Sequence, residues 1–170
     1  MAEVAAAADV SQGLAYRYFA GKDELVRALV AEALRSDRDA RLVQTSGTPG
    51  ERLRRLLTAI LEARRDHPEV FQLIDHVLED EDAPADLVSE CHRRGRWFVQ
   101  TLRELVVAGQ ATGEVVPGDP DQLVWAVIAC FEGLSRLRLR HPEHGCAHFP
   151  SADVVLRLVM RPRSEASPAC

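Results

Sequence analysis

The stretch from residue 10 to residue 25 constrains this chain most, because it reads as two short helices joined by a tight turn. Its sequence is V-S-Q-G-L-A-Y-R-Y-F-A-G-K-D-E-L, and an alanine-rich run precedes it. We expect a first helix from Glu3 to Ala8 and a second from Gln12 to about Tyr18. Ser11 is well placed to cap the second helix, since its hydroxyl can accept a free backbone N–H of the first turn.

The second helix carries many polar and aromatic side chains for its length. Ala15 and Phe19, four positions apart, can provide its apolar anchors. Tyr16 and Tyr18 lie two positions apart and cannot both be buried on one face, so at least one ring points outward, where its hydroxyl can bind a phosphate. This composition is typical of the reading helix of a helix-turn-helix. The alternative is that the tyrosines fill the core of a small bundle.

From Val4 to Leu25 the chain reads V-A-A-A-A-D-V-S-Q-G-L-A-Y-R-Y-F-A-G-K-D-E-L. This segment resembles the DNA-binding region of tetracycline-repressor-type (TetR family) transcriptional regulators, whose pattern is I-A-x-x-A-G-V-S-x-G-x-(L/I/F)-Y-x-(H/Y)-F-x-(S/N)-K-(D/E)-x-L. Asp9 replaces the glycine of the turn, which is tolerable because Asp adopts left-handed conformations more readily than most residues. Ala15 replaces a larger apolar residue. The positions that carry the resemblance are Val10, Ser11, Gly13, Tyr16, Tyr18, Phe19, Lys22 and Leu25.

The resemblance implies that a double-stranded DNA operator is the partner of this segment. Gln12 would approach base edges, where glutamine can bridge N6 and N7 of adenine. Tyr16, Tyr18 and Lys22 would hold phosphates and set the register, and Arg17 suits either role. The implied DNA-binding residues are therefore Ser11, Gln12, Gly13, Tyr16, Arg17, Tyr18 and Lys22.

Composition favours helices over sheets. Hydrophobic residues make up 46% of the chain but aromatic residues only 5%, so leucine, valine and alanine must fill the core. The formal net charge of −5 argues against a protein that coats nucleic acid nonspecifically, and DNA contacts must come from local geometry. We predict an all-α protein with an N-terminal helix-turn-helix unit and a C-terminal helical regulatory and dimerisation domain.

Capping signals divide the rest of the chain into helices. Thr48-Pro49-Gly50-Glu51 and Asp119-Pro120-Asp121-Gln122 each place a proline after an N-cap residue. We predict helices over residues 22–44, 84–110, 120–139 and 151–160. A further helix begins at residue 49, and another runs from residue 68 to the acidic loop 79–82. The predicted domains are 1–30 for DNA binding, 31–161 for ligand binding and dimerisation, and 162–170 as a disordered tail. Family members begin with one more helix, and we expect the DNA-binding unit to lack it.

The segment from Leu123 to Leu137 is apolar around most of a helix, whereas a surface helix shows one apolar stripe. We expect one face to pack on its own domain and the other on a second copy of the chain. The resemblance implies the same, because the corresponding helix and the last one form a four-helix dimer interface in the family. We expect that an arginine in place of Val127 or Phe131 yields a monomer or an aggregate.

An apolar cavity with a few polar groups is the usual site for a small-molecule effector. Ordinary core packing would account for the same residue types equally well. The residues on helices that surround such a pocket in the family are Phe71, His76, Trp97, Phe98, Trp125 and Cys130.

The other reactive side chains point to no cofactor and no enzyme. Residues 141–148 hold three histidines and Cys146, which are metal-binding types, but their spacing matches no common finger and a solvated loop accounts for them. Cys91 and His92 point about 100° apart on a helix and make a poor nucleophile and base pair. Without a signal peptide or an apolar run of membrane-spanning length, we expect a cytoplasmic protein.

We therefore interpret the chain as a homodimeric, ligand-responsive DNA-binding transcriptional regulator, a repressor that an effector releases from its operator. The alternative is a ligand-binding or structural helical homodimer that has lost specific DNA binding through N-terminal truncation. A third hypothesis is a metal sensor that uses residues 141–148.

Overall fold

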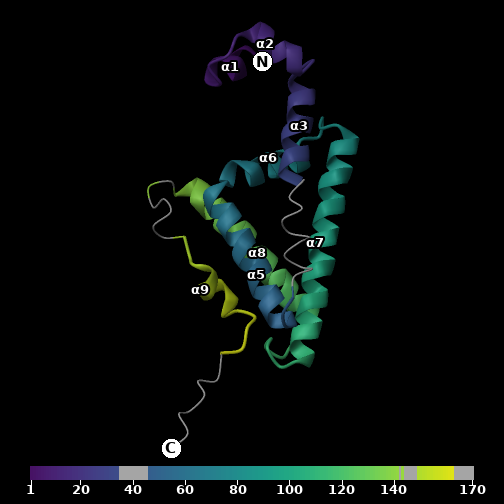
Figure 1. Cartoon of the computed structure of the whole chain (residues 1–170), viewed down its shortest axis with the longest axis vertical. Helices are drawn as coiled ribbons and strands as arrows, with labels where there is room; N and C mark the ends of the chain where they lie inside the picture. The colour runs from purple at the N-terminus through teal and green to yellow at the C-terminus, as the bar shows by residue number, and fades with distance from the viewer. Residues whose placement is uncertain (35–45, 142, 144–148, 163–170) are drawn as a thin grey trace, which may run out of the picture. The chain divides into compact units, whose positions relative to one another are not determined.

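The computed structural model describes residues 1–34, 46–141, 143 and 149–162. Within these residues it holds α-helices and no strand (Figure 1), which confirms the predicted all-α fold. No described helix is long and apolar enough to cross a membrane. The helices are α1 (Ala2–Ala7), α2 (Gln12–Tyr18), α3 (Lys22–Leu34), α5 (Pro49–Asp66), α6 (Pro68–Glu79), α7 (Ala85–Ala111), α8 (Pro120–Arg140) and α9 (Ala152–Leu156).

The turn between α1 and α2 has the features expected from the sequence. Asp9 has a φ of 53°, the left-handed conformation that a glycine would otherwise supply. The Ser11 hydroxyl accepts a hydrogen bond from the backbone N–H of Leu14 at 3.2 Å and so caps α2. As predicted, α2 begins at Gln12 and ends at Tyr18.

The chain forms two compact units, each with its own core. Unit 1 contains Met1–Ser36 and Gln72–Arg94, and unit 2 contains Asp37–Phe71 and Gly95–Cys170. Unit 1 thus combines the N-terminal helices with most of α6 and the first part of α7. The predicted domain boundary at residue 30 divides the chain elsewhere, and its functional meaning stays a prediction.

Unit 1 has a small apolar core that holds α3. Val30 of α3 is fully buried in a cluster with Val77 of α6 and with Leu87 and Cys91 of α7. Because these partners come from a part of the chain far from α3 in sequence, α3 is fixed by tertiary packing and not by its own amphipathic pattern alone.

Unit 2 has the larger core, and both predicted caps begin helices there. Thr48 and Glu51 form a complete capping box at the start of α5. The Asp119 carboxylate accepts hydrogen bonds from two backbone N–H groups in the first turn of α8. The core residues of unit 2 are Leu53, Leu56, Leu57, Leu61, Leu102, Leu105, Val106, Val115, Val124, Val127, Phe131, Val155, Leu156 and Val159.

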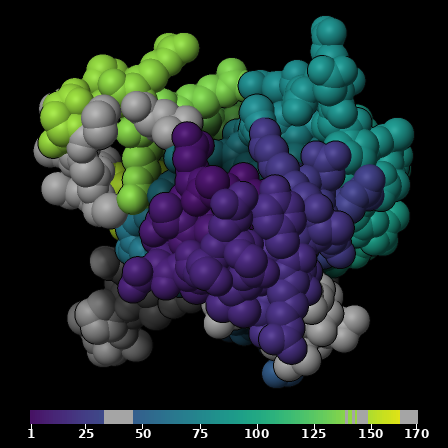
Figure 2. Space-filling view, turned by 90° about the horizontal axis from the view of Figure 1, so that it is seen from above, coloured from purple at the N-terminus to yellow at the C-terminus, as the bar shows by residue number. Residues whose placement is uncertain are grey.

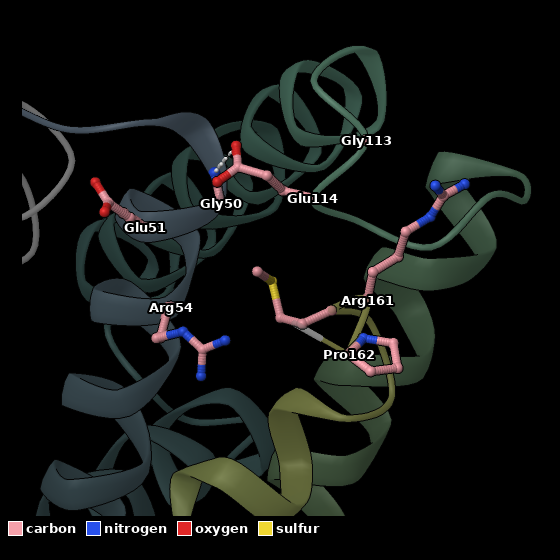
Figure 3. Close-up of a pocket in the computed structure, with 8 residues that line it drawn as sticks. Gly50, Glu51, Arg54, Gly113, Glu114, Arg161 and Pro162 are labelled. Atoms are coloured by element: carbon pink, nitrogen blue, oxygen red, sulfur yellow. Dashed lines mark hydrogen bonds between the residues drawn. The ribbon is translucent and has the colours of Figure 1, made fainter. Parts of the chain in front are cut away.

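The segment between α7 and α8 adds a second cap to α5. The Glu114 carboxylate accepts a hydrogen bond from the backbone N–H of Gly50 at 3.2 Å (Figure 3). It also accepts hydrogen bonds from the hydroxyls of Thr48 and Thr112. These hydrogen bonds hold the pKa of Glu114 below its usual value, and the bond from Thr48 has the largest effect. Glu114 therefore places a negative charge at the N-terminus of α5, where the helix dipole favours one.

The structure places Val127 and Phe131 on the side of α8 that packs on its own domain. Val127 and Phe131 have 0% and 1% of their surface exposed and lie in the core of unit 2, so neither is available to a partner. They follow buried Val124 by three and seven positions, which places all three on one side of the helix. The exposed apolar residues Trp125 and Leu137 lie on the other side of α8.

Two predicted helices have other limits. α9 ends at Leu156 and not near residue 160, because the chain leaves the helix and pairs Met160 with Val115 in an isolated bridge. The described part of the helix predicted over 22–44 ends at Leu34, and its continuation lies outside the described residues. Residues 163–170 of the predicted tail also lie outside them.

Replacing Glu114 by glutamine should lower stability at neutral pH by about 0.3 to 1 kcal/mol, the usual contribution of an anion at an accessible helix N-terminus. Since the folded-state pKa of Glu114 lies below its ordinary value of 4.5, its contribution is complete above that value and is lost as the pH falls through the folded-state pKa. Urea unfolding at neutral and acidic pH measures both effects. Glu62→Gln changes an exposed carboxylate of the same helix, and an equal loss in that variant would contradict the capping role.

Candidate nucleic-acid interface

α2 exposes most of its side chains. Only Ala15 and the following Phe19 are partly buried, which confirms them as the anchors of this helix. Tyr16 and Tyr18 are 49% and 69% exposed, so neither ring fills the core of unit 1. Figure 2 looks onto the N-terminal helices, drawn in purple.

Helical geometry sorts the exposed residues of α2 into two sides, because successive residues turn roughly 100° around the axis. Gln12 and Tyr16 lie four positions apart and share one side, and Gly13 and Arg17 form the adjacent row. We call these four residues the reader strip. Tyr18 projects from the opposite side of the helix. The predicted DNA contacts therefore lie on two sides of α2.

The polar groups of the reader strip are not used within the described part of the chain. Its side chains make no hydrogen bond or ion pair to a described residue, and neither do those of Tyr18 and Lys22. Ser11 differs, because its hydroxyl caps α2. The donors and acceptors of the strip are thus open to an external ligand, whereas Ser11 positions the helix that carries them.

Gly13 lies in the first turn of α2, where the fold does not require a glycine. A Cβ atom at this position would meet nothing within 4 Å. Glycine within a helix is less favourable than alanine by roughly 0.5 to 1 kcal/mol. A glycine that packing does not explain is consistent with close approach of an external surface to the helix backbone.

The acidic residues that follow α2 stabilise the N-terminus of α3. Asp23 and Glu24 lie in its first turn, where a negative charge interacts favourably with the helix dipole. The Glu24 carboxylate also accepts a hydrogen bond from the backbone N–H of Ala20. Lys22, the first residue of α3, is exposed beside them. Local geometry thus leaves a cation accessible although the chain as a whole is acidic.

An ion pair adds to the packing that holds α3 within unit 1. The Arg27 guanidinium of α3 donates a hydrogen bond to the Asp86 carboxylate near the start of α7. This hydrogen bond holds the pKa of Asp86 below its usual value. Because Arg27 lies nine residues after Tyr18, the contact anchors the helix that directly follows the reader.

The six predicted effector-pocket residues do not form one cluster. Trp97, Phe98 and Cys130 are partly buried in unit 2. His76 is exposed and belongs to unit 1. Trp125 is 61% exposed, which is not the position expected of a pocket residue. It follows buried Val124 directly and is therefore out of phase with the buried side of α8.

Phe71, the sixth residue, has a packing partner of its own. The Arg64 guanidinium lies over the Phe71 ring, 4.3 Å from the ring centroid. Arg64 also donates a hydrogen bond to the Ser135 hydroxyl at 2.7 Å. Unit 2 has two cavities that none of the six residues lines. Arg54, Met160 and Arg161 line both of them. Sequence reasoning missed Arg54 and Arg161 because isolated arginines in a sequence are usually interpreted as solvated residues.

The metal-sensor hypothesis stays a prediction. Among the described residues no group of three His, Cys, Asp or Glu side chains could hold a metal ion. His141 Nδ1 and Glu143 Oε1 approach each other at 3.1 Å, whereas residues 144–148 lie outside the described chain. Cys91 is buried, and burial raises the pKa of its thiol, which disfavours the thiolate that a nucleophile needs.

Two short helices joined by a tight turn, the second capped and exposed, form a helix-turn-helix. Residues 1–29 match the family model described as bacterial regulatory proteins, tetR family. No curated protein matches the chain.

Solved structures share the fold over most of the chain. The MbdR regulator from Azoarcus sp. CIB has a TM-score of 0.74 at 20% identity, with 92% of this chain and 84% of that chain covered. PfmR, a TetR family transcriptional regulator from Thermus thermophilus, has a TM-score of 0.66 at 18% identity, with 92% and 86% covered. AibR in complex with isovaleryl coenzyme A and operator DNA has a TM-score of 0.63 at 17% identity, with 91% and 81% covered.

The likeness to these structures establishes the fold, and the family match covers the reader itself. The chain therefore has the fold of these structures, and its residues 1–29 are similar to the tetR family of bacterial regulatory proteins. The resemblance read from residues 4–25 is thereby confirmed.

Gly13→Ala should weaken binding to operator DNA by about ten-fold, equivalent to about 1.4 kcal/mol, because the added methyl group separates the reader strip from the DNA surface. The same change should leave thermal stability equal or slightly higher, since alanine is the better helix former. Fluorescence anisotropy and circular dichroism measure the two effects.

Gly95→Ala is the matched control, because Gly95 lies in α7 and a Cβ atom there also meets nothing within 4 Å. It should leave DNA affinity unchanged. Unchanged affinity in the Gly13 variant as well would remove Gly13 from the interface.

Proposed function

We propose that this regulator is a homodimeric repressor that a small-molecule effector releases from its operator. The observation that carries the proposal is the reader strip, whose polar groups are free on a capped helix within the segment that matches the family. The crystal structure of AibR holds isovaleryl coenzyme A and operator DNA together. One protein of this fold therefore binds both kinds of ligand, which supports a coupled role here.

We assign base reading to Gln12 of the strip and contact with the DNA backbone to the residues around it. Gln12, at the start of the strip, is placed to meet an adenine edge, and Arg17 can meet a base or a phosphate. A helix in the major groove runs between two phosphate backbones, so Tyr18 on its opposite side and Lys22 beyond its end suit phosphate contacts. Tyr16, within the strip, keeps the phosphate role implied by the family.

We propose that the homodimer forms through the side of α8 opposite the core. The small Ala129 and Gly133 lie between Trp125 and Leu137, which are 61% and 54% exposed. We call these four residues the dimer face. Exposed Val154 and Leu158 from the C-terminal segment add apolar surface in the same unit. A dimer would present two readers to half-sites about 34–36 Å apart, one helical turn of DNA.

The effector is proposed to bind in unit 2, where Trp97, Phe98 and Cys130 combine partly buried apolar surface with a thiol. Its binding would change the separation of the two readers and so lower operator affinity. We propose the cytoplasm as the compartment, since the operator is there.

Gln12→Ala and Lys22→Ala should weaken DNA binding in different ways. Gln12→Ala should relax the preference at one base pair of each half-site, at a cost of about 1–3 kcal/mol in discrimination. Lys22→Ala should weaken binding to all sequences alike and lower the slope of log affinity against log salt by about one unit. Fluorescence anisotropy with an operator selected from random duplexes, and with single-base variants of it, separates these effects.

An equal loss on specific and random DNA in the Gln12 variant would contradict its base-reading role. Failure of the parent protein to select any sequence would contradict the repressor and favour the alternative, a ligand-binding homodimer that does not bind specific DNA.

Trp125→Arg and Leu137→Arg should each weaken the homodimer by more than about thirty-fold, since a central anchor typically contributes at least about 2 kcal/mol. Analytical ultracentrifugation over a concentration series gives the dissociation constants. Val107→Arg is the control, because Val107 is an exposed apolar residue of α7 outside the dimer face. A parent protein that is monomeric at micromolar concentration would overturn this interface, and so would an equal effect of Val107→Arg.

A further inference from the structure

Unit 2 contains a groove that the proposed function does not use. It has a volume of about 630 Å³ and lies where α5 meets the C-terminal segment that includes α9. A smaller cavity of about 200 Å³ adjoins it and shares Arg54, Met160, Arg161 and Pro162 with it (Figure 3). The larger space is of the size that binds small organic molecules. We call it the arginine groove.

The arginine groove concentrates positive charge in a chain whose net charge is −5. Arg54, Arg157 and Arg161 line it, and Asp153 supplies the single carboxylate among its described lining residues. Asp153 lies 3.5 Å from Arg54, and its side chain is 81% exposed, so the pair is long and weak. The guanidinium groups of Arg157 and Arg161 make no hydrogen bond or ion pair to a described residue. Within the described residues, two positive charges therefore remain uncompensated.

Neither of the nearby glutamates, Glu51 and Glu114, forms an ion pair with a described arginine of the groove. Glu51 and Glu114 line the smaller cavity and not the larger one. The Glu51 carboxylate accepts a hydrogen bond from the backbone N–H of Thr48 at 3.1 Å, and that of Glu114 caps the same helix through Gly50. Both carboxylates are thus engaged at the start of α5, as Figure 3 shows for Glu114 and Gly50.

The backbone at the arginines is held by the fold. Arg161 donates its backbone N–H to the carbonyl of Glu114 at 2.9 Å, next to the bridge between Val115 and Met160. Arg54 directly follows Leu53, which is fully buried in the core. Guanidinium groups on an ordered backbone lose less freedom on binding a ligand than groups on a loose one.

We propose that the arginine groove binds a phosphate monoester with a short apolar substituent. A phosphate monoester carries a charge of about −1.5 to −2 at pH 7 and has three acceptor oxygens. Arginine presents paired N–H donors that match such oxygens, and the two uncompensated charges match the dianion. Met160 and Pro162 offer apolar contact to the substituent. A monocarboxylate would neutralise only one of the two charges.

Hexyl phosphate titrated into the purified full chain in a calorimeter tests the proposal. We expect saturable binding that combining Arg157→Gln with Arg161→Gln weakens by roughly ten-fold or more, since charge-assisted hydrogen bonds are about twice as strong as neutral ones. Asp153→Asn removes the carboxylate that competes for Arg54 and should tighten binding several-fold. This second variant gains affinity, so a folding defect cannot produce its effect.

The matched control is Arg96→Gln, because Arg96 is an exposed arginine of α7 in the same unit, outside the groove. It should leave binding unchanged. Absence of saturable binding by the parent protein would overturn the proposal, as would an equal loss in the Arg96 variant or weaker binding by Asp153→Asn. DNA affinity is measured separately on the same variants, so failure of this site is distinguishable from failure of the proposed repressor.

Discussion

Helices as short as α1 and α2 cannot be stable in water through their own hydrogen bonds. They have six and seven residues, whereas isolated helices need about 12–15 residues to be even marginally stable. The structure meets this constraint from outside the helices. Ser11 caps α2, Asp9 closes the turn in a left-handed conformation, and α3 packs into the core of unit 1. The position of the reader depends on all three.

The same constraint explains why the reader can remain exposed. Ala5 is the only fully buried residue of α1 and α2, so almost no side chain of these helices is committed to a core. Their order comes from backbone caps and from α3, and the polar groups of the reader strip therefore remain available to an external ligand. Segments with so few buried contacts belong to the least stable parts of a protein, so contact with DNA would order them further.

In unit 2, the packing of one large core determines which side chains are left on the surface. α8 buries Val124, Val127 and Phe131 on one side, and this choice determines that Trp125 and Leu137 face outward. The loop at Glu114 caps α5 and also fixes the backbone of Arg161. One short segment thus contributes both to the stability of α5 and to the position of an arginine in the groove. Core packing, capping and surface chemistry are therefore coupled in this unit.

The local features of this protein could be predicted from its sequence. They are the turn at Asp9, the cap at Ser11, the limits of α2, the capping box at Thr48 and the resemblance of the N-terminal segment to the tetR family. Each of these features depends on residues within a few positions of one another, so the sequence spacing is sufficient to predict it. Only the tertiary structure decided which side of α8 is buried, that Trp125 is exposed, and that α9 ends early to pair Met160 with Val115. When a helix is apolar around most of its circumference, its sequence pattern does not indicate which side is buried. The helices that pack against it determine the buried side. The arginine groove arises in the same way, because Arg54 and Arg161 are more than 100 residues apart in sequence and only the packing of α5 against the C-terminal segment brings them together.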